Sequence, residues 1–281
     1  MTGRRTALVT GANSGIGAAL VEQLAAGGHD VILAARSAER TGPVLDGIRA
    51  RHPEIRATFL SLDLADLGAI RRAVATLAAA GTPVDLLVNN AGVAGTRALS
   101  ADGFDLTYAT NHLGPFLLTD LLLPVLRTSA AGRIVNVASV AHTRVRRLSW
   151  EGLEPRVVPR PSRFADYAVT KLMNVLHAAE LARRLAGTRV TVAAMHPGGV
   201  ASNIWRKVPQ PFRWLITRPM ISNADGAASV LHVATAPELQ AVSGRYYHRY
   251  RERTPSALAT DVSLAEELWT RTASAIARTG R

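Results

Sequence analysis

The sequence predicts an α/β protein with a single doubly wound, mostly parallel sheet that is flanked by helices. Short apolar runs of strand length alternate with segments of helical character from residue 5 to residue 276, as in successive strand–helix–strand units. The first strand leads through a glycine-rich turn directly into a helix. No internal repeat or linker divides the chain, so we expect residues 1–281 to form one domain.

The glycine-rich turn follows the first predicted strand, residues 5–10, and precedes a predicted helix over residues 18–26. Glycines allow the backbone to approach a pyrophosphate, and a helix N-terminus offers N–H groups and a positive dipole. The spacing is Gly-x-x-x-Gly-x-Gly rather than the commoner Gly-x-Gly-x-x-Gly, and a plain tight turn is the alternative. The preceding strand favours a dinucleotide site with contacts from Gly11, Asn13, Ser14, Gly15, Ile16 and Gly17.

The second predicted strand, residues 30–35, is followed by Arg36 and Ser37. An NAD-binding site usually has an acidic residue here, whereas a guanidinium suits the 2′-phosphate of NADP(H). The sequence therefore predicts NADP(H) as the cofactor, with Arg36 at its 2′-phosphate. The alternative is a solvated arginine at the start of a helix that Ser37 caps. The nearest acid, Glu39, is expected inside that helix.

Two further strand ends are expected to face the same crevice. Residues 56–62 form the third predicted strand, and residues 84–88 form the fourth. Asp63, directly after the third strand, could accept a hydrogen bond from an adenine amino group or could cap a helix that starts near Asp66. A turn of small residues, 89–92, follows the fourth strand. We expect cofactor contacts from Asp63, Leu64, Asn90, Ala91 and Gly92.

The middle of the chain contains a long predicted helix and a strand that ends at a hydroxyl group. The helix, residues 104–126, carries Asn111 in an apolar stretch, where a hydrogen-bonded core asparagine is the alternative to a functional one. The strand, residues 133–138, ends at Ser139, whose side chain is expected to face the crevice. Residues 140–163 are rich in arginine and proline, so we expect a surface insert and not a core element.

The helix predicted over residues 165–185 carries Tyr167 and Lys171. Side chains four residues apart lie on one face of a helix. The pKa of a free tyrosine is roughly 10, and a fixed ammonium beside it favours the phenolate. We therefore expect Lys171 to lower the pKa of Tyr167, which would make the phenol a general acid and base near neutral pH. An ordinary amphipathic helix is the alternative, because Tyr-x-x-x-Lys is a short pattern.

The last part of the chain completes the sheet and contains a segment that could cover a ligand. Residues 190–195 form a strand that is followed by Pro197 and Gly198, which are expected to contact the cofactor. Residues 200–222 contain aromatics among prolines, which suits a substrate lid over an apolar ligand or a packed surface loop. We then predict a helix over residues 224–234, a strand over 244–247 and an amphipathic helix over 264–276.

Composition argues against several other classes of protein. The chain has no cysteine, which excludes disulfides, thiolate metal sites and a cysteine nucleophile, and no metal site is predicted. The net charge of +12 does not predict nucleic-acid binding, because the basic residues are scattered and lack interleaved aromatics. A basic surface can still favour anionic ligands. No targeting segment or membrane-spanning run is visible, so we predict a cytoplasmic protein.

Taken together, these residues resemble the single-domain short-chain dehydrogenase/reductase (SDR) family over nearly the whole chain. The motifs occur in family order and comprise Thr10 to Gly17, Asp63, Asn89 to Gly92, Asn111, Ser139, Tyr167 with Lys171, and Pro197 with Gly198. The retinol-dehydrogenase-like group is the most similar, through residues 102–105, 111–118, 133–139 and 243–247. Pro115 departs from that group, where a histidine is usual, and we expect no counterpart of the N-terminal membrane anchor of many animal relatives.

The resemblance implies a Rossmann-type fold and an NADP(H)-dependent oxidoreductase that interconverts an apolar ketone or aldehyde and its alcohol. It implies that Tyr167 is the general acid or base, that Ser139 donates a hydrogen bond to the carbonyl oxygen, and that Lys171 holds the nicotinamide ribose. It also implies that Asn111 holds a water of a proton relay, and that helices 104–126 and 165–185 pair the chain into a homodimer or homotetramer. The alternative is a non-catalytic dinucleotide-binding redox sensor or scaffold, which a missing catalytic residue would favour.

Overall fold

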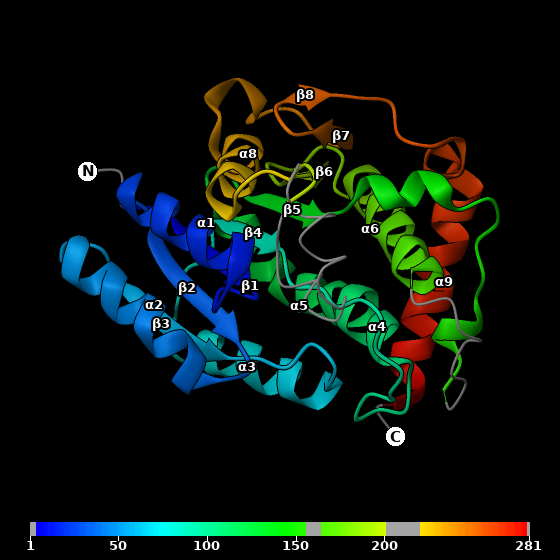
Figure 1. Cartoon of the computed structure of the whole chain (residues 1–281), viewed down its shortest axis with the longest axis horizontal. Helices are drawn as coiled ribbons and strands as arrows, with labels where there is room; N and C mark the ends of the chain where they lie inside the picture. The colour runs from blue at the N-terminus through cyan, green and yellow to red at the C-terminus, as the bar shows by residue number, and fades with distance from the viewer. Residues whose placement is uncertain (1–3, 156–163, 201–219, 280–281) are drawn as a thin grey trace.

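The computed structural model describes residues 4–155, 164–200 and 220–279. Within these ranges one eight-stranded sheet has the order β3-β2-β1-β4-β5-β6-β7-β8, and all neighbours except β7 and β8 are parallel (Figure 1). The predicted doubly wound α/β sheet is therefore confirmed. The strands are β1 (Thr6–Thr10), β2 (Asp30–Ala35), β3 (Ala57–Ser61), β4 (Leu86–Asn89), β5 (Arg133–Val137), β6 (Thr191–His196), β7 (Arg245–His248) and β8 (Arg251–Glu252).

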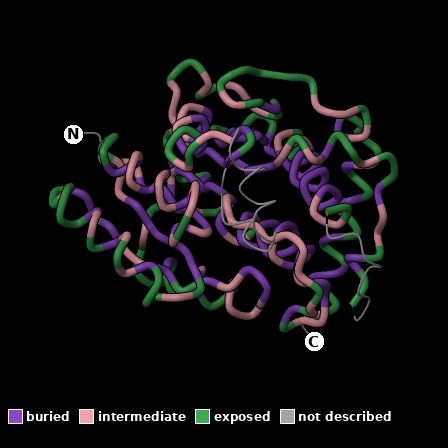
Figure 2. The backbone as a smooth tube through the Cα atoms, in the orientation of Figure 1, coloured by how far each residue is buried: buried purple, intermediate pink, exposed green. Residues whose placement is uncertain are grey.

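Helices cover both faces of this sheet (Figure 1). Helices α1, α2 and α8 pack against one face of the sheet through buried residues that include Leu20, Ile48 and Val230. Helices α3, α5 and α6 pack against the other face through residues that include Ile70, Leu118 and Leu172. Figure 2 shows the central strands β1, β4, β5 and β6 buried along their length and the outer sides of the helices exposed. None of the described helices is both long and apolar enough to cross a membrane. The helices are α1 (Gly15–Ala26), α2 (Ala38–Arg51), α3 (Leu67–Ala79), α4 (Leu106–Tyr108), α5 (Gly114–Thr128), α6 (Ala165–Arg184), α8 (Asn223–Thr235) and α9 (Val262–Thr279).

Predicted and observed strands agree closely, because buried parallel strands are continuous apolar runs that a sequence shows directly. The predicted second strand, residues 30–35, has the bounds of β2. The exception is β8, which was not predicted. It consists of two exposed, charged residues that pair antiparallel with β7, so no apolar signal marks it.

The predicted helix over residues 104–126 is wrong as one continuous α-helix. The Asp105 carboxylate accepts hydrogen bonds from the backbone N–H groups of Thr107 and Tyr108, and it caps the short helix α4. Residues Ala109–Leu113 then form a π-helical turn before α5 begins. Such turns are frequent at functional sites, and this one contains Asn111.

The predicted surface insert, residues 140–163, is partly a core element. Leu148 and Leu153 are buried. A Cβ placed on Gly152 would lie 2.2 Å from the Tyr108 ring, so the insert packs closely on α4 at this glycine. Residues 156–163 of the insert, and all but the ends of the predicted substrate lid over residues 200–222, lie outside the described residues.

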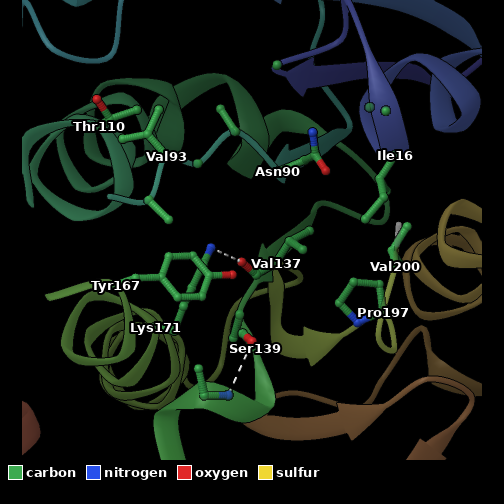
Figure 3. A pocket seen from close by; sticks show the side chains of 18 of the residues that line it. Ile16, Asn90, Val93, Thr110, Val137, Ser139, Tyr167, Lys171, Pro197 and Val200 are labelled. Atoms are coloured by element: carbon green, nitrogen blue, oxygen red, sulfur yellow. Dashed lines mark hydrogen bonds between the residues drawn. The ribbon is translucent and has the colours of Figure 1, made fainter. Parts of the chain in front are cut away.

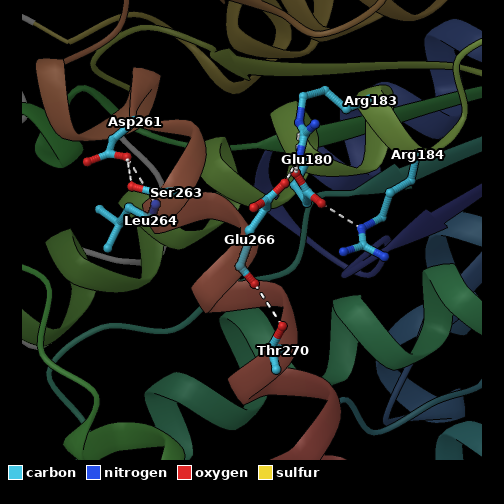
Figure 4. Close-up of polar contacts among 8 residues, drawn as sticks. All are labelled: Glu180, Arg183, Arg184, Asp261, Ser263, Leu264, Glu266 and Thr270. Carbon is cyan, nitrogen blue, oxygen red and sulfur yellow. Dashed lines mark hydrogen bonds and ion pairs between the residues drawn. The ribbon is translucent and has the colours of Figure 1, made fainter.

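The C-terminal helix α9 packs along α6, one of the two helices that are expected to pair copies of the chain. The Arg184 guanidinium of α6 lies 4.3 Å from the centre of the Trp269 ring of α9. The buried Glu180 carboxylate accepts hydrogen bonds from Arg183 and Arg184, and Arg183 also pairs with Glu266 of α9 (Figure 4). The chain therefore covers part of this surface itself, and the homodimer or homotetramer stays a prediction.

We expect Trp269→Ala to lower the free energy of unfolding by about 3 kcal/mol, because it removes the ring by which α9 packs against Phe116 and His177. The centroid of the Trp269 ring lies 4.7 Å from that of Phe116 and 5.8 Å from that of His177. Urea unfolding followed by circular dichroism measures the change. Trp269→Phe keeps an aromatic ring and is expected to lose less than half as much. A loss within about 0.5 kcal/mol for Trp269→Ala would show that α9 contributes little to stability.

Candidate active site

A cleft of about 1120 Å³ opens at the carboxyl ends of the parallel strands, on both sides of the point where the strand order reverses at β1. Three predicted catalytic residues, Ser139, Tyr167 and Lys171, line it (Figure 3). Every residue predicted to contact the cofactor also lines it, namely Gly11, Asn13, Ser14, Gly15, Ile16, Gly17, Arg36, Asp63, Leu64, Asn90, Ala91, Gly92, Tyr167, Lys171, Pro197 and Gly198. The predicted set thus lies in one place, and the role of each residue stays a prediction.

The glycine turn after β1 is packed too closely to hold larger residues. Gly15 has φ +60°, a conformation that residues with a side chain rarely adopt. A Cβ placed on Gly17 would lie 2.3 Å from the carbonyl oxygen of Gly11 and 2.7 Å from the Asn90 side-chain nitrogen. The start of α1 therefore approaches both the turn and the end of β4, and it leaves its first N–H groups at the surface of the cleft.

Thr10, at the end of β1, joins the two turns at the centre of the cleft. Its hydroxyl accepts hydrogen bonds from the backbone N–H groups of Asn90 and Ala91, both at 3.0 Å. The Asn90 side chain in turn donates to the Thr10 carbonyl at 2.8 Å. Sequence analysis included Thr10 in the glycine motif but not among the residues that contact the cofactor, although a hydroxyl at the end of a parallel strand is the same signal that identified Ser139.

Two guanidinium groups line the end of the cleft next to β2. Arg36 and Arg40 are exposed, and within the described residues neither forms an ion pair. Ser37 caps α2 by accepting a hydrogen bond from the Arg40 N–H at 3.2 Å. Arg36 is thus an exposed arginine directly before a helix that Ser37 caps, as the alternative interpretation predicted. This position does not exclude a contact between Arg36 and a phosphate. Arg40 was missed, because its place at the cleft depends on where α2 begins.

Asp63 lies in the cleft and does not cap the following helix. The cap of α3 is Asp66, whose carboxylate accepts a hydrogen bond from the Ala69 N–H at 2.8 Å. Asp63 accepts one from the Ala65 N–H at 2.9 Å. Of the two interpretations left open by the sequence, helix capping by Asp63 is wrong, and a contact with the adenine stays a prediction.

Ser139, Tyr167 and Lys171 meet where β5 ends beside the first turn of α6 (Figure 3). The Ser139 hydroxyl accepts a hydrogen bond from the Ala141 N–H at 3.2 Å. The Lys171 ammonium donates to the Val137 carbonyl at 2.7 Å and lies 5.6 Å from the centre of the Tyr167 ring. The strand end and the helix face together arrange a phenol, a hydroxyl and an ammonium around one space.

The expected lowering of the Tyr167 pKa is wrong for this arrangement. Burial raises the pKa of Tyr167 to about 12, and only a contact with the Ser139 hydroxyl acts in the opposite direction. Burial also lowers the pKa of Lys171 to about 8. The sequence placed the ammonium beside the phenol correctly, but the ammonium is directed at the Val137 carbonyl, and the penalty of burying a phenolate is larger. At neutral pH the phenol is therefore protonated.

Asn111 does not line the cleft, but it forms hydrogen bonds with Val93, which does. Its side-chain oxygen accepts a hydrogen bond from the Val93 N–H at 2.8 Å, and its amide donates to the Val93 carbonyl at 2.9 Å and to the Thr170 hydroxyl at 3.0 Å. A Cβ on Gly92 would lie 3.4 Å from the Asn111 side chain and 3.5 Å from the Lys171 ammonium. Both amide N–H groups are thus used within the protein, and the water relay stays a prediction.

Two histidines that sequence analysis did not assign to the site line the cleft at the ends of β6 and β7. His196 and His248 are partners in the strand register, and their ring centroids lie 4.9 Å apart. Burial lowers the pKa of His196 to about 4, and the nearby charges of His248, His142 and Lys171 act in the same direction. His196 is therefore neutral at neutral pH. Their place at strand ends is the signal that could have identified both.

Comparison with known proteins agrees with this geometry. A family model described as short chain dehydrogenase matches residues 5–150. Dehydrogenase/reductase SDR family member 13 from Bos taurus is 40% identical over 94% of this chain and 71% of its own, and retinol dehydrogenase 13 from Mus musculus is 37% identical over 96% and 83%. A short chain dehydrogenase from Burkholderia cenocepacia, solved in complex with NADP, is 31% identical over 87% of this chain and 95% of its own, with a TM-score of 0.68. The chain belongs to the short-chain dehydrogenase/reductase family and is similar to its retinol dehydrogenases.

Proposed function

We propose that the protein is an NADP(H)-dependent oxidoreductase, acting on CH–OH donors, that interconverts an apolar ketone or aldehyde and the corresponding alcohol. The observation that carries the proposal is that Ser139, Tyr167 and Lys171 converge at one end of a cleft whose other end holds the glycine turn and Arg36. Membership of the family and the NADP bound to one relative support it.

The residues of the cleft fit a nicotinamide dinucleotide phosphate. Gly15, Ile16 and Gly17 at the start of α1 line the cleft, and their backbone N–H groups would bind a pyrophosphate. Arg36 and Arg40 offer planar donors to a 2′-phosphate. The bound cofactor would supply or accept the hydride at the carbonyl carbon of the substrate.

Side chains of the protein would transfer the proton and stabilise the negative charge that develops on the substrate's carbonyl oxygen. Tyr167, protonated at neutral pH, donates a proton to the carbonyl oxygen in reduction and takes it back in oxidation. The Ser139 O–H donates a hydrogen bond to the same oxygen, where negative charge develops. Lys171, which donates a hydrogen bond to the Val137 carbonyl of β5, would also hold a ribose hydroxyl of the bound cofactor.

The test of the reaction is consumption of NADPH with a panel of ketones and aldehydes of increasing apolar size, followed at 340 nm. Turnover with at least one carbonyl compound, lost in Tyr167→Phe, would support the proposal. Binding of NADPH without turnover across the panel would favour the alternative of a redox sensor or scaffold. The cytoplasmic location stays a prediction.

We expect the pure protein to bind NADPH more tightly than NADH, and we expect Arg36→Asp to weaken NADPH binding by about 10- to 100-fold, because it replaces a charge-assisted hydrogen bond with a repelling carboxylate. Fluorescence titration with both dinucleotides measures this. Arg71→Asp, an equal change of charge at an exposed position of α3, is the control and should bind both cofactors as the wild type does. Tighter binding of NADH by the wild type would contradict the assignment of Arg36.

A further inference from the structure

The catalytic end of the cleft carries three arginines that the proposed reaction does not use. Arg144, Arg146 and Arg147 line the cleft together with Ser139 and Tyr167. Their side chains are exposed, and within the described residues none of the three guanidinium groups forms an ion pair or a hydrogen bond. Among the described residues that line the cleft, the only carboxylate belongs to Asp63. Among the described residues of the cleft, no carboxylate therefore neutralises the positive charge beside Ser139 and Tyr167.

These arginines follow a different strand of the sheet from Arg36. Arg36 follows β2 and Arg144 lies just beyond β5, and the strands β1 and β4 separate β2 from β5 in the sheet. Three interstrand steps of about 4.8 Å place the two strand ends roughly 14 Å apart. The cleft thus has two separate basic ends, one for the adenosine half of a dinucleotide and one beside Ser139.

The arginine segment is held between two buried anchors. The Ser256 N–H donates to Nε2 of His142 at 3.2 Å, so the proton of the neutral ring is on Nδ1, which donates to the Ser139 carbonyl at 2.7 Å. The His142 ring also packs on Tyr246 at 5.0 Å between centroids. Leu148 is buried at the other end of the segment. The backbone that carries the three arginines is therefore fixed relative to Ser139.

Apolar surface lies beside this basic group. Val140 and Phe164 are 45% and 52% exposed, which makes them two of the few large apolar side chains at the surface of the described residues, and both line the cleft. Val93 and Met220 line it as well. A ligand with a hydrophobic body and one anionic group would match both features, since guanidinium groups bind carboxylate and phosphate in a planar, two-pronged geometry.

We propose that the substrate is an amphiphile in which the reacting carbonyl or alcohol and an apolar body are joined to a carboxylate or phosphate that binds Arg144, Arg146 and Arg147. The inference rests on the proposed oxidoreductase function and specifies its substrate class. An anionic substrate group would account for the basic residues in the cleft-facing part of the insert that follows Ser139. The buried Leu148 and Leu153 anchor the same insert to the domain.

The test compares C12 aldehydes that end in a carboxylate, a phosphate or an uncharged methyl ester. We expect the wild type to use at least one charged aldehyde with a kcat/KM about 10-fold or more above that of the ester. The variant Arg144→Gln/Arg146→Gln/Arg147→Gln should lose that preference, keep its kcat/KM for the ester within about twofold, and keep its affinity for NADPH. The control Arg71→Gln/Arg127→Gln/Arg189→Gln removes three exposed arginines outside the cleft and should retain the preference. Which charged aldehyde is preferred distinguishes a carboxylate from a phosphate.

Two other outcomes of this comparison would overturn the inference, and a third calls for a binding measurement. Equal use of all three aldehydes would overturn it and leave the proposed function intact. A loss of NADPH affinity in the triple variant would assign the arginines to the cofactor. If no aldehyde is turned over, calorimetry with dodecanoate, dodecyl phosphate and dodecanol in the presence of NADPH still tests it, and equal binding of all three overturns it. Arginine-dependent binding to vesicles of anionic lipid, without preference among the soluble probes, would point to a membrane surface instead and would also overturn it.

Discussion

Tyr167→Phe is expected to lower kcat by about 100-fold or more and to leave the affinity for NADPH within about twofold of the wild type. The substitution removes only the hydroxyl that would exchange a proton with the substrate, and lost acid–base catalysis has an effect of this size. The ring stays in place on the first turn of α6, and the hydrogen bond of 2.7 Å from Lys171 to the Val137 carbonyl does not involve the phenol. Stopped-flow or steady-state oxidation of NADPH with the best carbonyl substrate measures kcat, and fluorescence titration measures the affinity.

The control for this experiment is Tyr250→Phe, the same chemical change at an exposed tyrosine outside the cleft. Its kcat should equal that of the wild type. An unaltered kcat in Tyr167→Phe would contradict the role of the phenol, even if NADPH still binds. A parallel loss of NADPH affinity and of kcat would show instead that the hydroxyl positions the cofactor.

The fold and the position of the site could be predicted from sequence because both depend on local signals. Buried strands are continuous apolar runs, and the residues directly after them must lie at one edge of a parallel sheet. This reasoning predicts that Gly11, Arg36, Ser139 and Pro197 share one cleft, and all four line it. The same reasoning applied to every strand end would have added Thr10 and His196.

The errors concern contacts between segments that are distant in the chain. The burial of Gly152 depends on its fit against Tyr108, which no local pattern shows. The direction of the Tyr167 pKa depends on burial and on the Val137 carbonyl that attracts the Lys171 ammonium. The spacing of Tyr167 and Lys171 predicts that the two groups are neighbours, but it does not predict which acceptor the ammonium contacts.

A second large effect is expected from two histidines buried between α5, α6 and α9. Nε2 of His112 and the Thr272 hydroxyl form a hydrogen bond of 2.8 Å. The Asn136 side-chain amide donates a hydrogen bond of 3.3 Å to Nδ1 of His177. The ring centroids of the two histidines lie 6.2 Å apart. Burial lowers the pKa of His112 to about 3 and that of His177 to about 4, and no carboxylate is among the groups that shift either pKa. Both rings are thus neutral in the folded protein.

The sign of the effect follows from linkage. In the unfolded chain each histidine takes up a proton below about pH 6.5, whereas in the folded protein it does not, so acid favours the unfolded state. Between pH 8 and pH 5, each ring is expected to lower the free energy of unfolding by about 2 kcal/mol, or about 4 kcal/mol for His112 and His177 together. Asp166 opposes this loss, because burial raises its pKa to about 6, whereas the lowered pKa of His196 adds to the loss. A loss of this size is a large part of the stability of a typical domain.

Urea unfolding at fixed ionic strength between pH 8 and pH 5 tests this argument with a variant that keeps both hydrogen bonds. His112→Gln retains a polar group near Nε2 for Thr272, and His177→Asn retains an acceptor near Nδ1 for Asn136. The double variant can be less stable than the wild type at pH 8, but its loss between pH 8 and pH 5 should be smaller by about 4 kcal/mol. His232→Gln, at a partly exposed histidine of α8, should keep the wild-type loss. An identical loss in the double variant and the wild type would mean that these rings do not set the acid sensitivity, and the single variants would show whether one of them does.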